Sequence, residues 1–528
     1  MKTEIKHIVY LMLENRSLDQ LLGWLYDEQH PPLVNIPSQV SPTYNGLKEN
    51  TYFNLDSNGN KHYVVKGVDN MNVPVHDPHE KYGHVNIQLF DTTENQSCKI
   101  PPPMSGFYKD FASYHDQTHQ IMQSYTPFDL PVINGLAKHF AVSDHYFCSV
   151  PTQTNCNRAF AAAGNSLGIN DNNELEAFVN NRDFSHVPPH LSQPVGHQFN
   201  QKTMWNVLSD HGFDQPSDWM HYYSQGTWWE DLLGVEGYAY TRDLMTQLQP
   251  ELFDQHFDKI DTFFERAKAG TLPKVCFLEP EWGLEMPIDD RDYGINGNDY
   301  HPPTNLIPGE AFVKKIYDHL TSNKEAWANT LFIINFDEHG GTYDHVGPSP
   351  CATEPWASDG TPAPKKENRE EGFDFKRFGV RVPLLLISPR VPESTVFRAK
   401  GPTPFDHTSV IATILNMFGI PKSSWGLGGR TANAPTFECV FECNPIRQDI
   451  PIVEVNKHPK TLEGIENTTP PNDIHLRMAH SLLHRVLKKE GLSKEETDAL
   501  QLPKLIDAET VVDLSKRLKA ALKAVKNR

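Results

Sequence analysis

Four short apolar runs constrain the fold of this chain more than any other feature. The runs lie at residues 7–13, 274–278, 331–336 and 382–388. Such runs, rich in β-branched residues and apolar on both sides, are typical of central strands in a parallel sheet that helices cover on each face. Segments with apolar residues at helical spacing, such as residues 130–139 and 310–320, lie between them. The alternation predicts an α/β sandwich whose ligands bind beyond the carboxyl ends of the strands.

The rest of the chain predicts additions to this sandwich. We expect residues 1–450 to form the main domain and residues 451–528 to form a C-terminal helical extension that becomes helical near residue 472. Polar, Pro-rich and aromatic stretches without a steady period are expected to form loops or a cap over the site. These stretches lie at residues 28–110, 180–235 and 346–375. The basic helix at the C-terminus either touches an anionic membrane surface or packs on the main domain, and packing is the preferred interpretation.

Charge and cysteine content restrict the partners and the cross-links. The formal net charge of the 528-residue chain is −19, which argues against broad nucleic-acid binding, because contact with phosphate backbones requires a basic excess. Seven dispersed cysteines without a CxxC pair predict mostly free thiols rather than a disulfide scaffold. Cys439 and Cys443 are near enough in sequence to bridge, but two buried thiols are the preferred interpretation.

Membrane and export signals are not visible in the sequence. No apolar run approaches the roughly 20 residues of a membrane span. The first apolar run leads directly into Glu14-Asn15-Arg16 and follows no basic stretch, so it is expected to be a strand and not a cleavable leader. We expect a protein that is cytoplasmic or is secreted by a leaderless, effector-type route. Its oligomeric state does not follow from the sequence.

The strongest chemical signal follows the apolar run at residues 331–336. Asp337, Glu338 and His339 come directly after it, two glycines allow a tight turn, and Asp344 and His345 follow. Adjacent carboxylates repel each other unless a cation or a proton neutralises them. A metal site therefore explains this cluster better than an acidic turn does.

Two further segments supply oxygen ligands and a hydroxyl. Glu14 and Asn15 end the first apolar run and are either metal ligands or a helix cap. Thr154 and Arg158 lie in a segment that begins a helix of small residues, where a hydroxyl can act as a nucleophile on a phosphate that the helix N-terminus favours. Taken alone, the threonine is more often a cap.

Two loop histidines extend the list of candidates. His79 lies in the segment Asp77-Pro-His-Glu80, and His301 lies before two prolines. Each is either a surface histidine or, beside a metal, a contact to phosphoryl oxygens or a proton donor to a leaving group.

At these residues the sequence resembles the bacterial phosphoesterase family of phospholipases C and acid phosphatase A, a branch of the alkaline phosphatase superfamily. The matching segments appear in the family's order and span roughly residues 5 to 420. They lie at residues 7–17, 77–80, 125–131, 147–151, 157–158, 301–303, 337–341, 381–383 and 387–389. The resemblance implies an alkaline-phosphatase-like three-layer sandwich with a central, mostly parallel sheet.

The resemblance also implies a role for each matching residue. A divalent metal ion would be held by Glu14, Asn15, Thr154, Asp337 and Glu338. Thr154 would attack phosphorus and form a phosphothreonine intermediate, which water then hydrolyses. Asn15, His79 and His301 would stabilise the equatorial oxygens, one histidine could protonate the leaving alkoxide, and Arg158 would orient the loop or bind phosphate.

The choice of nucleophile and of metal rests on details of these motifs. Thr152 and Thr154 both lie in the nucleophile loop, and Thr154 is chosen because it lies four residues before Arg158. Oxygen-only coordination favours Ca²⁺ or Mg²⁺. Zinc is the alternative, because nearby His79, His301 and His345 could supply nitrogen ligands.

The sequence departs from the family at one histidine. The family often carries a histidine a few residues after a tryptophan, whereas Trp219 is followed at that spacing by Ser224. His221 either substitutes for the missing histidine or faces solvent.

The leading functional hypothesis is a metal-dependent phospholipase C that acts on phosphatidylcholine or related lipids, with transient contact to a membrane surface. Six aromatic residues could receive a choline-like cation or an acyl-glycerol body, or they could simply pack in a cap. They are Trp205, Trp219, Tyr222, Tyr223, Trp228 and Trp229. The alternatives are a broad-specificity acid phosphatase and a non-catalytic lipid- or partner-binding module.

Overall fold

A nine-stranded sheet forms the centre of the computed structural model. The structure describes residues 4–116, 118–172, 199–224, 239–282, 297–348, 351–356, 372–441, 446–460 and 470–526. The strand order is β2-β13-β7-β12-β11-β1-β10-β8-β9. The strands are β1 (His7–Leu13), β2 (Val34–Ile36), β7 (Ala141–Ser143), β8 (Trp219–Tyr223), β9 (Phe257–Lys259), β10 (Val275–Leu278), β11 (Thr330–Phe336), β12 (Leu384–Ile387) and β13 (Thr395–Phe397).

Most neighbouring strands of this sheet are parallel. β1 lies between β10 and β11 and is parallel to both, with Leu13 opposite Phe336 at the carboxyl ends of β1 and β11. Strand β12 is antiparallel to both of its neighbours, β11 and β7. The prediction that residues 382–388 form a parallel strand is therefore wrong in direction, because apolarity on both faces reports burial and not the direction of the chain.

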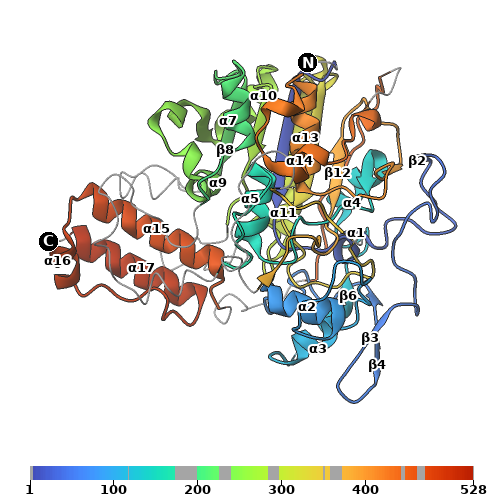
Figure 1. Ribbon diagram of the computed structural model, residues 1–528, viewed down its shortest axis with the longest axis horizontal. Helices are drawn as coiled ribbons and strands as arrows, with labels where there is room; N and C mark the ends of the chain where they lie inside the picture. The colour runs from blue at the N-terminus through green and yellow to red at the C-terminus, as the bar shows by residue number, and fades with distance from the viewer. Residues whose placement is uncertain are drawn as a thin grey trace.

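Two groups of helices make the outer layers. Helix α11 packs against both α4 and α10, helices α5, α7 and α13 pack with one another, and the two groups cover the sheet as an α/β sandwich (Figure 1). The sandwich that the sequence predicted is confirmed. The helices of the main domain are α1 (Leu18–Leu22), α2 (Tyr82–Phe90), α3 (Phe107–Ala112), α4 (Pro131–His139), α5 (Thr154–Ala163), α7 (Met204–Asp210), α9 (Tyr240–Leu244), α10 (Ile260–Ala269), α11 (Leu306–Ser322), α12 (Lys324–Trp327), α13 (His407–Met417) and α14 (Gly428–Asn433).

Two stretches that we predicted as loops or cap contain parts of the fold. Strand β8 belongs to the central sheet, although it falls within residues 180–235; residues 180–198 and 225–235 of that stretch lie outside the described residues. Residues 28–110 contain β2, α2, α3 and short strands outside the main sheet. These short strands are β3 (Phe53–Leu55), β4 (Lys61–Tyr63) and β5 (Val65–Lys66), the last paired with β6 (Gln123–Ser124).

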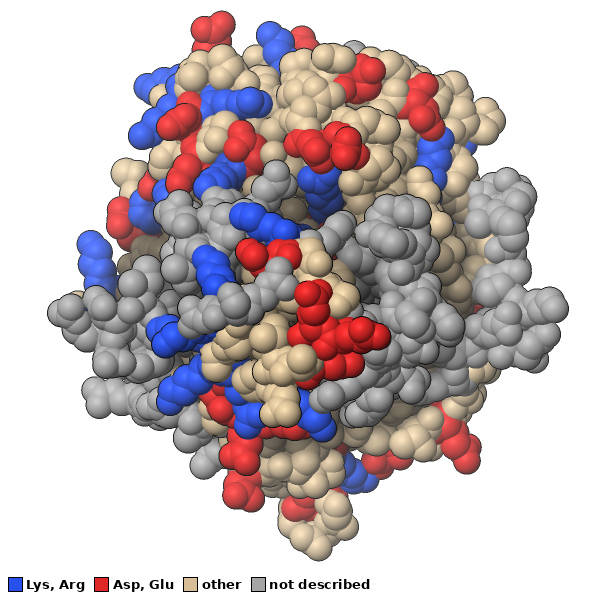
Figure 2. Space-filling view, turned by 90° about the vertical axis from the view of Figure 1, so that its left-hand side faces the viewer, with Lys and Arg blue, Asp and Glu red and all other residues tan. Residues whose placement is uncertain are grey.

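The C-terminal region is helical and lies at one side of the sandwich (Figure 1). It contains α15 (Asp473–Lys489), α16 (Lys494–Ala499) and α17 (Val511–Lys526). One face of α17 is buried, and α17 packs against α15. The apolar residues of this face are Val511, Leu514, Leu518, Ala521, Leu522 and Val525. The surface on this side carries basic and acidic side chains interspersed (Figure 2). The apolar face of the basic helix is therefore used inside the protein. None of the helices in the described residues has the length and apolarity to cross a membrane.

The cysteines differ from the prediction in one pair. Cys98 and Cys351 form a disulfide across a sequence separation of 253 residues, which no spacing rule reveals. Cys148, Cys156 and Cys276 are buried thiols, as predicted. Cys439 is exposed, so the prediction of a buried thiol is wrong there, and Cys443 lies outside the described residues.

Candidate active site

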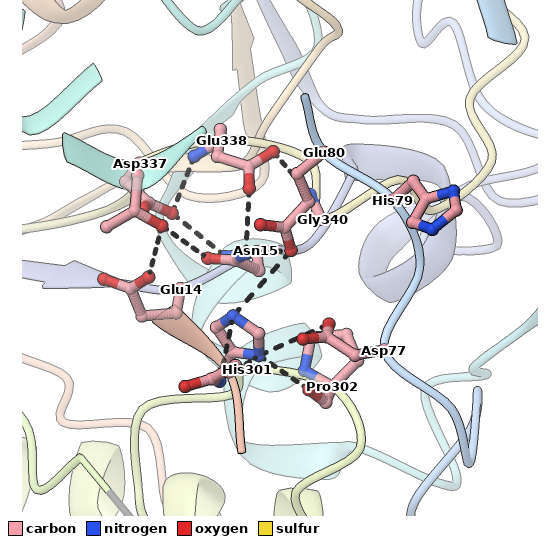
Figure 3. Close-up of polar contacts among 12 residues, drawn as sticks. Glu14, Asn15, Asp77, His79, Glu80, His301, Pro302, Asp337, Glu338 and Gly340 are labelled. Atoms are coloured by element: carbon pink, nitrogen blue, oxygen red, sulfur yellow. Dashed lines mark hydrogen bonds and ion pairs between the residues drawn. The ribbon is translucent and has the colours of Figure 1, made fainter. Parts of the chain in front are cut away.

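The carboxyl ends of β1 and β11 bring two polar pairs together. Because these strands are parallel and in register, Glu14 and Asn15 emerge beside Asp337 and Glu338 (Figure 3). The backbone N–H of Asn15 donates to Oδ1 of Asp337 at 3.0 Å. All four side chains are buried. From the sequence, both pairs are expected at strand ends of one sheet, and their grouping as ligands of one ion is implied by the family resemblance.

The two strand ends approach each other closely because of their backbone conformations. Asn15 has a φ of 57°, in the left-handed region that asparagine tolerates better than most residues. Gly340 has a φ of 58°, and a Cβ atom at this position would lie 2.1 Å from the carbonyl oxygen of Asn15. Only glycine fits here, which explains the first glycine after the acidic pair.

The side chain of Asn15 is oriented by two carboxylates. Its Nδ2 donates to Oε1 of Glu80 at 2.5 Å and to Oε1 of Glu338 at 2.8 Å. Both amide hydrogens are thereby used, so Oδ1 faces the opposite side, where the hydroxyl of Thr154 lies 3.4 Å away. Asn15 therefore presents its amide oxygen toward the hydroxyl of Thr154 and its amide nitrogen toward the carboxylates of Glu80 and Glu338.

Helix α5 delivers a hydroxyl and a guanidinium to the same carboxylate. Thr154 is the first residue of α5, and its Oγ1 lies 3.2 Å from Oε2 of Glu14. One turn later, Arg158 donates from Nε to Oε1 of Glu14 at 2.7 Å and also donates to it from Nη2. Thr152 points elsewhere, because its hydroxyl donates to the carbonyl of Asn170 at 2.5 Å. Of the two threonines, Thr154 is the one whose hydroxyl lies beside the carboxylate that Arg158 binds, and its role as nucleophile stays a prediction.

The site concentrates buried negative charge. Burial raises the pKa of Glu14 and of Glu338 well above their usual range, and the nearby Asp337 raises both further. Burial also raises the pKa of Asp337, although Arg158 opposes this shift. Within the described residues Oδ2 of Asp337, which faces Glu14, accepts no hydrogen bond, and Nε of Arg158 lies 3.9 Å from it (Figure 3). Several buried carboxylates beside a single arginine fit a site that binds a further cation, and their oxygens suit a hard divalent ion.

A second acidic group adjoins the first and was missed by the sequence analysis. Asp77 and Glu80 flank the ring of His301: Nδ1 lies 3.7 Å from Oδ1 of Asp77, and Nε2 lies 3.7 Å from Oε1 of Glu80 (Figure 3). These three residues have the spacing of metal ligands. Burial raises the pKa of Glu80 well above its usual range, and Glu338 and Asp77 add to the shift. Glu80 joins the two groups, because it also accepts from Asn15.

His301 is neutral near pH 7. Burial lowers its pKa to about 3. Nδ1 lies 2.6 Å from the carbonyl of Pro302, which leaves Nε2 as the acceptor facing Glu80. The amide Nδ2 of Asn472, which precedes α15, lies 3.3 Å from Nδ1 and 3.4 Å from Nε2 of the ring. The C-terminal region therefore reaches the site, which the sequence analysis did not predict.

Two of the predicted histidines lie away from the carboxylates. His79 lies to one side of the group in Figure 3, where its ring stacks on Tyr114 and contacts His84. Nδ1 of His345 donates to Oδ2 of Asp19 at 2.6 Å, in a buried ion-pair network that also contains Arg381. The structure brings only His301 of the three proposed nitrogen ligands to the carboxylates.

The aromatic residues expected to receive a head group are mostly core residues. Trp205, Trp219 and Tyr222 are fully buried, and Trp228 and Trp229 lie outside the described residues. His221 is also buried and packs against Trp205, with ring centroids 4.2 Å apart, so it does not face solvent. Strand β8 places these side chains in the sandwich, which explains why they pack in the core.

Two other aromatic rings do adjoin the site. The guanidinium of Arg158 lies 4.8 Å from the ring centroid of Trp282 and 5.5 Å from that of Tyr240. Rings at this distance support a cation without competing for its hydrogen bonds. Nη1 of Arg158 has no hydrogen-bond partner among the described residues, so it is available to an anionic ligand.

A hydroxyl at a helix start, a buried guanidinium and several buried carboxylates thus lie together at one edge of the sheet. Such a set of groups suits the hydrolysis of a phosphoric ester. Comparison with known proteins is more specific. The model of the Phosphoesterase family matches residues 5–421, and the chain belongs to this family. The family predicted from the sequence motifs is confirmed.

Relatives of the chain come from plants and bacteria. Non-specific phospholipase C3 of Arabidopsis thaliana is 30% identical over 85% of this chain and 75% of its own length. Phospholipase C B of Mycobacterium tuberculosis is 25% identical over 88% of this chain and 84% of its own length. A solved protein of the alkaline phosphatase superfamily from Vibrio parahaemolyticus aligns with a TM-score of 0.29 and 12% identity, covering 58% of this chain and 64% of that one, which adds nothing to the assignment.

Proposed function

We propose that this protein is a metal-dependent phospholipase C that hydrolyses phosphatidylcholine or related phospholipids through a phosphothreonine intermediate. The products would be diacylglycerol and the phosphorylated head group. One observation carries the proposal: the hydroxyl of Thr154 lies 3.2 Å from the carboxylate of Glu14, which Arg158 also holds. The names of the plant and mycobacterial relatives support the lipid substrate.

Thr154 is the proposed nucleophile. Its position at the first turn of α5 lets the backbone N–H groups of the helix start favour the negative charge of a phosphoryl group. Oε2 of Glu14 is the nearest acceptor for the hydroxyl proton. Attack of Oγ1 on phosphorus would form the P–O bond to Thr154 while the bond to the diacylglycerol oxygen breaks.

The proposed cation ligands are Glu14, Asn15, Thr154, Asp337 and Glu338. A divalent ion held by them would lower the pKa of the Thr154 hydroxyl and neutralise charge on the phosphoryl oxygens. The oxygen donors favour Ca²⁺ or Mg²⁺, whereas Zn²⁺ would draw on His301. Arg158 would bind a phosphoryl oxygen through Nη1, and Asn15 would keep its oxygen turned toward Thr154.

His301 is the proposed proton donor to the leaving alkoxide. It is the one of the two predicted histidines that faces the carboxylates. An anionic phosphoryl group bound beside the ring would raise its pKa, because an opposite charge favours the protonated form. A proton held at Nε2 would then pass to the departing oxygen, and the neutral ring would accept a proton from water when the phosphothreonine is hydrolysed.

A broad-specificity acid phosphatase with the same core is the second candidate. It is favoured by the burial of Trp205, Trp219 and Tyr222, which removes three of the aromatic residues proposed to receive a lipid head group. A non-catalytic binding module is disfavoured, because the hydroxyl, the arginine and the carboxylates all meet in one place.

Parallel assays on phosphatidylcholine vesicles and on an aryl phosphate monoester test the proposal. We expect diacylglycerol and phosphocholine from the vesicles, and we expect Thr154→Ala to abolish their release. Activity confined to the monoester would favour the phosphatase. Unchanged hydrolysis by Thr154→Ala would overturn the assignment of the nucleophile for both candidates.

Export and transient contact with a membrane surface are also proposed. The Cys98–Cys351 disulfide favours an oxidising compartment over the cytoplasm, and so supports secretion of the protein. Fractionation of producing cells, with detection of the protein in the medium, tests this.

A further inference from the structure

Three ligand atoms converge in a second place, apart from the carboxylates of the site. Nδ1 of His79 lies 2.9 Å from Nδ1 of His84, and Nδ1 of His84 lies 2.7 Å from Oδ1 of Asp110. The three atoms all lie within 4.8 Å of one another. His79 precedes α2, His84 lies in its first turn, and Asp110 lies in α3. The cluster therefore joins a loop and two helices.

Hydrogen bonds alone cannot satisfy the two ring nitrogens and the carboxylate oxygen of this cluster. If His84 carries its proton on Nδ1, that single N–H must be divided between the lone pair of His79 and the carboxylate of Asp110. If His84 is unprotonated there, His79 can donate to it from Nδ1, but the Nδ1 lone pair of His84 then faces the carboxylate of Asp110 without a donor between them. A divalent cation is bound by all three at once, with both rings neutral and protonated at Nε2.

The carboxylate of Asp110 is oriented by a hydrogen bond, as the ligands of bound metal ions usually are. Asp110 is 2% exposed, and its second oxygen, Oδ2, accepts from Nε2 of Gln88 at 2.9 Å. The same Gln88 nitrogen donates to the carbonyl of His79 at 2.8 Å. Hydrogen bonds of this kind fix the orientation of ligating groups. His84 is 33% exposed, which leaves a path for an ion and a position for water.

We propose that His79, His84 and Asp110 form a structural site for a borderline divalent metal ion, Zn²⁺ being the best match. Two imidazole nitrogens and one carboxylate oxygen are preferred ligands of zinc, with water as the fourth. Ligands around a tetrahedral zinc ion are about 3.3 Å apart, so the groups need to separate by only a few tenths of an ångström.

The proposed ion would fix the loop that carries Asp77 and Glu80. His79 is the residue next to Glu80, and the ion would tie it to α2 and α3. Oε1 of Gln88 also contacts Nε2 of His339 at 2.8 Å, and His339 adjoins Glu338. The side chains of Gln88 and His339 thus connect the zinc site to Glu338, although the zinc site takes no part in the chemistry proposed for the carboxylates.

Zinc binding by the full-length protein tests the proposal. After dialysis against metal-free buffer, the zinc bound per chain is measured for the wild type, His84→Ala, Asp110→Asn and the matched control His115→Ala, a neighbouring histidine outside the cluster. We expect His84→Ala and Asp110→Asn to bind one zinc ion fewer than the wild type and the control. We also expect added zinc to raise the Tm of the wild type and of His115→Ala, but not that of Asp110→Asn.

A spectroscopic measurement on the wild type keeps the test decisive if a variant folds poorly. Co²⁺ in a four-coordinate site with two nitrogen ligands absorbs visible light strongly, whereas Co²⁺ on oxygen ligands in six-fold coordination absorbs weakly. We expect the strong bands, and we expect one equivalent of Zn²⁺ to remove them. Equal zinc content in all four proteins, an equal loss in His115→Ala, or only weak Co²⁺ bands would overturn the proposal.

Discussion

At the scale of single residues, the functional argument depends on which of two threonines faces the carboxylates. Thr152 and Thr154 are both buried and lie two positions apart. The hydroxyl of Thr152 bonds to a backbone carbonyl, whereas that of Thr154 faces Glu14. The two residues therefore form a matched pair, one proposed to be catalytic and one structural.

Thr154→Ala is expected to lower kcat/KM by at least about a thousandfold, because the nucleophile is removed. Thr152→Ala is expected to keep activity and to lose about 1 kcal/mol of folding free energy, since it removes one buried hydrogen bond. Initial rates and urea denaturation of both variants check this. A loss of activity in Thr152→Ala with retention in Thr154→Ala would reverse the assignment.

For the segment Asp77-Pro-His-Glu80, the sequence predicted the position near the site but not which side chains face it. The motif correctly marked a segment near the site, but the sequence analysis chose His79, whereas Asp77 and Glu80 turn toward Asn15 and His301. Which of several adjacent side chains faces inward depends on the backbone conformation just before α2. That conformation is held by hydrogen bonds of the His79 backbone to the hydroxyl of Tyr114, which lies 35 residues later, and to the side chain of Gln88 in α2.

At the scale of helices and strands, the sequence was most informative where a whole element is buried. The runs that became β1 and β11 predicted two buried strands that end in polar residues, and the parallel pairing of these strands brings those ends together. Strand β8 was missed because its side chains are large, aromatic and partly polar, as in a loop. The antiparallel direction of β12 was missed because the tertiary path of the chain decides it.

Helix α15 is the element for which we predict a pH dependence. Nδ1 of His475 accepts from the backbone N–H of Asn472 at 3.2 Å at the start of the helix, and burial lowers the pKa of His475 to about 4. A depressed histidine pKa stabilises the fold above the unfolded pKa of about 6.5, and this stabilisation is lost as the pH falls toward the folded value. When the pH is lowered from 7.5 to 5, the protonation of His475 should reduce the free energy of unfolding by about 2 kcal/mol.

The variant His475→Gln should lose less stability than the wild type over the same pH interval. Other buried histidines titrate in both proteins. The loss of unfolding free energy from pH 7.5 to pH 5 is therefore measured for each protein by urea denaturation, and the two losses are compared. Equal losses in both proteins would show that His475 is not responsible.

At the scale of the whole molecule, the metal content links folding and chemistry. Chelation is expected to lower activity at least about tenfold and to lower the Tm, because the buried carboxylates of Glu14, Asp337 and Glu338 then repel one another. Adding back Ca²⁺ or Mg²⁺ should restore activity in the wild type and in His84→Ala alike. Restoration by Zn²⁺ alone would contradict the oxygen-only ligand set.

The disulfide between Cys98 and Cys351 should also stabilise the molecule as a whole. It joins the segment after α2 to the segment after the acidic turn at β11. Closing so long a loop restricts the unfolded chain, and Cys98→Ser is expected to cost about 2–4 kcal/mol. Thermal unfolding with and without a reductant measures the effect, and a reductant that leaves the Tm of the oxidised protein unchanged would contradict it.

The contact between Asn472 and His301 has a consequence for the time at which the protein matures. Asn472 follows His301 by 171 residues, so it is made later than that histidine and later than the carboxylates of β1 and β11. A growing chain that has not yet reached residue 472 therefore carries His301 without its amide neighbour. The order of biosynthesis itself delays the appearance of a finished site.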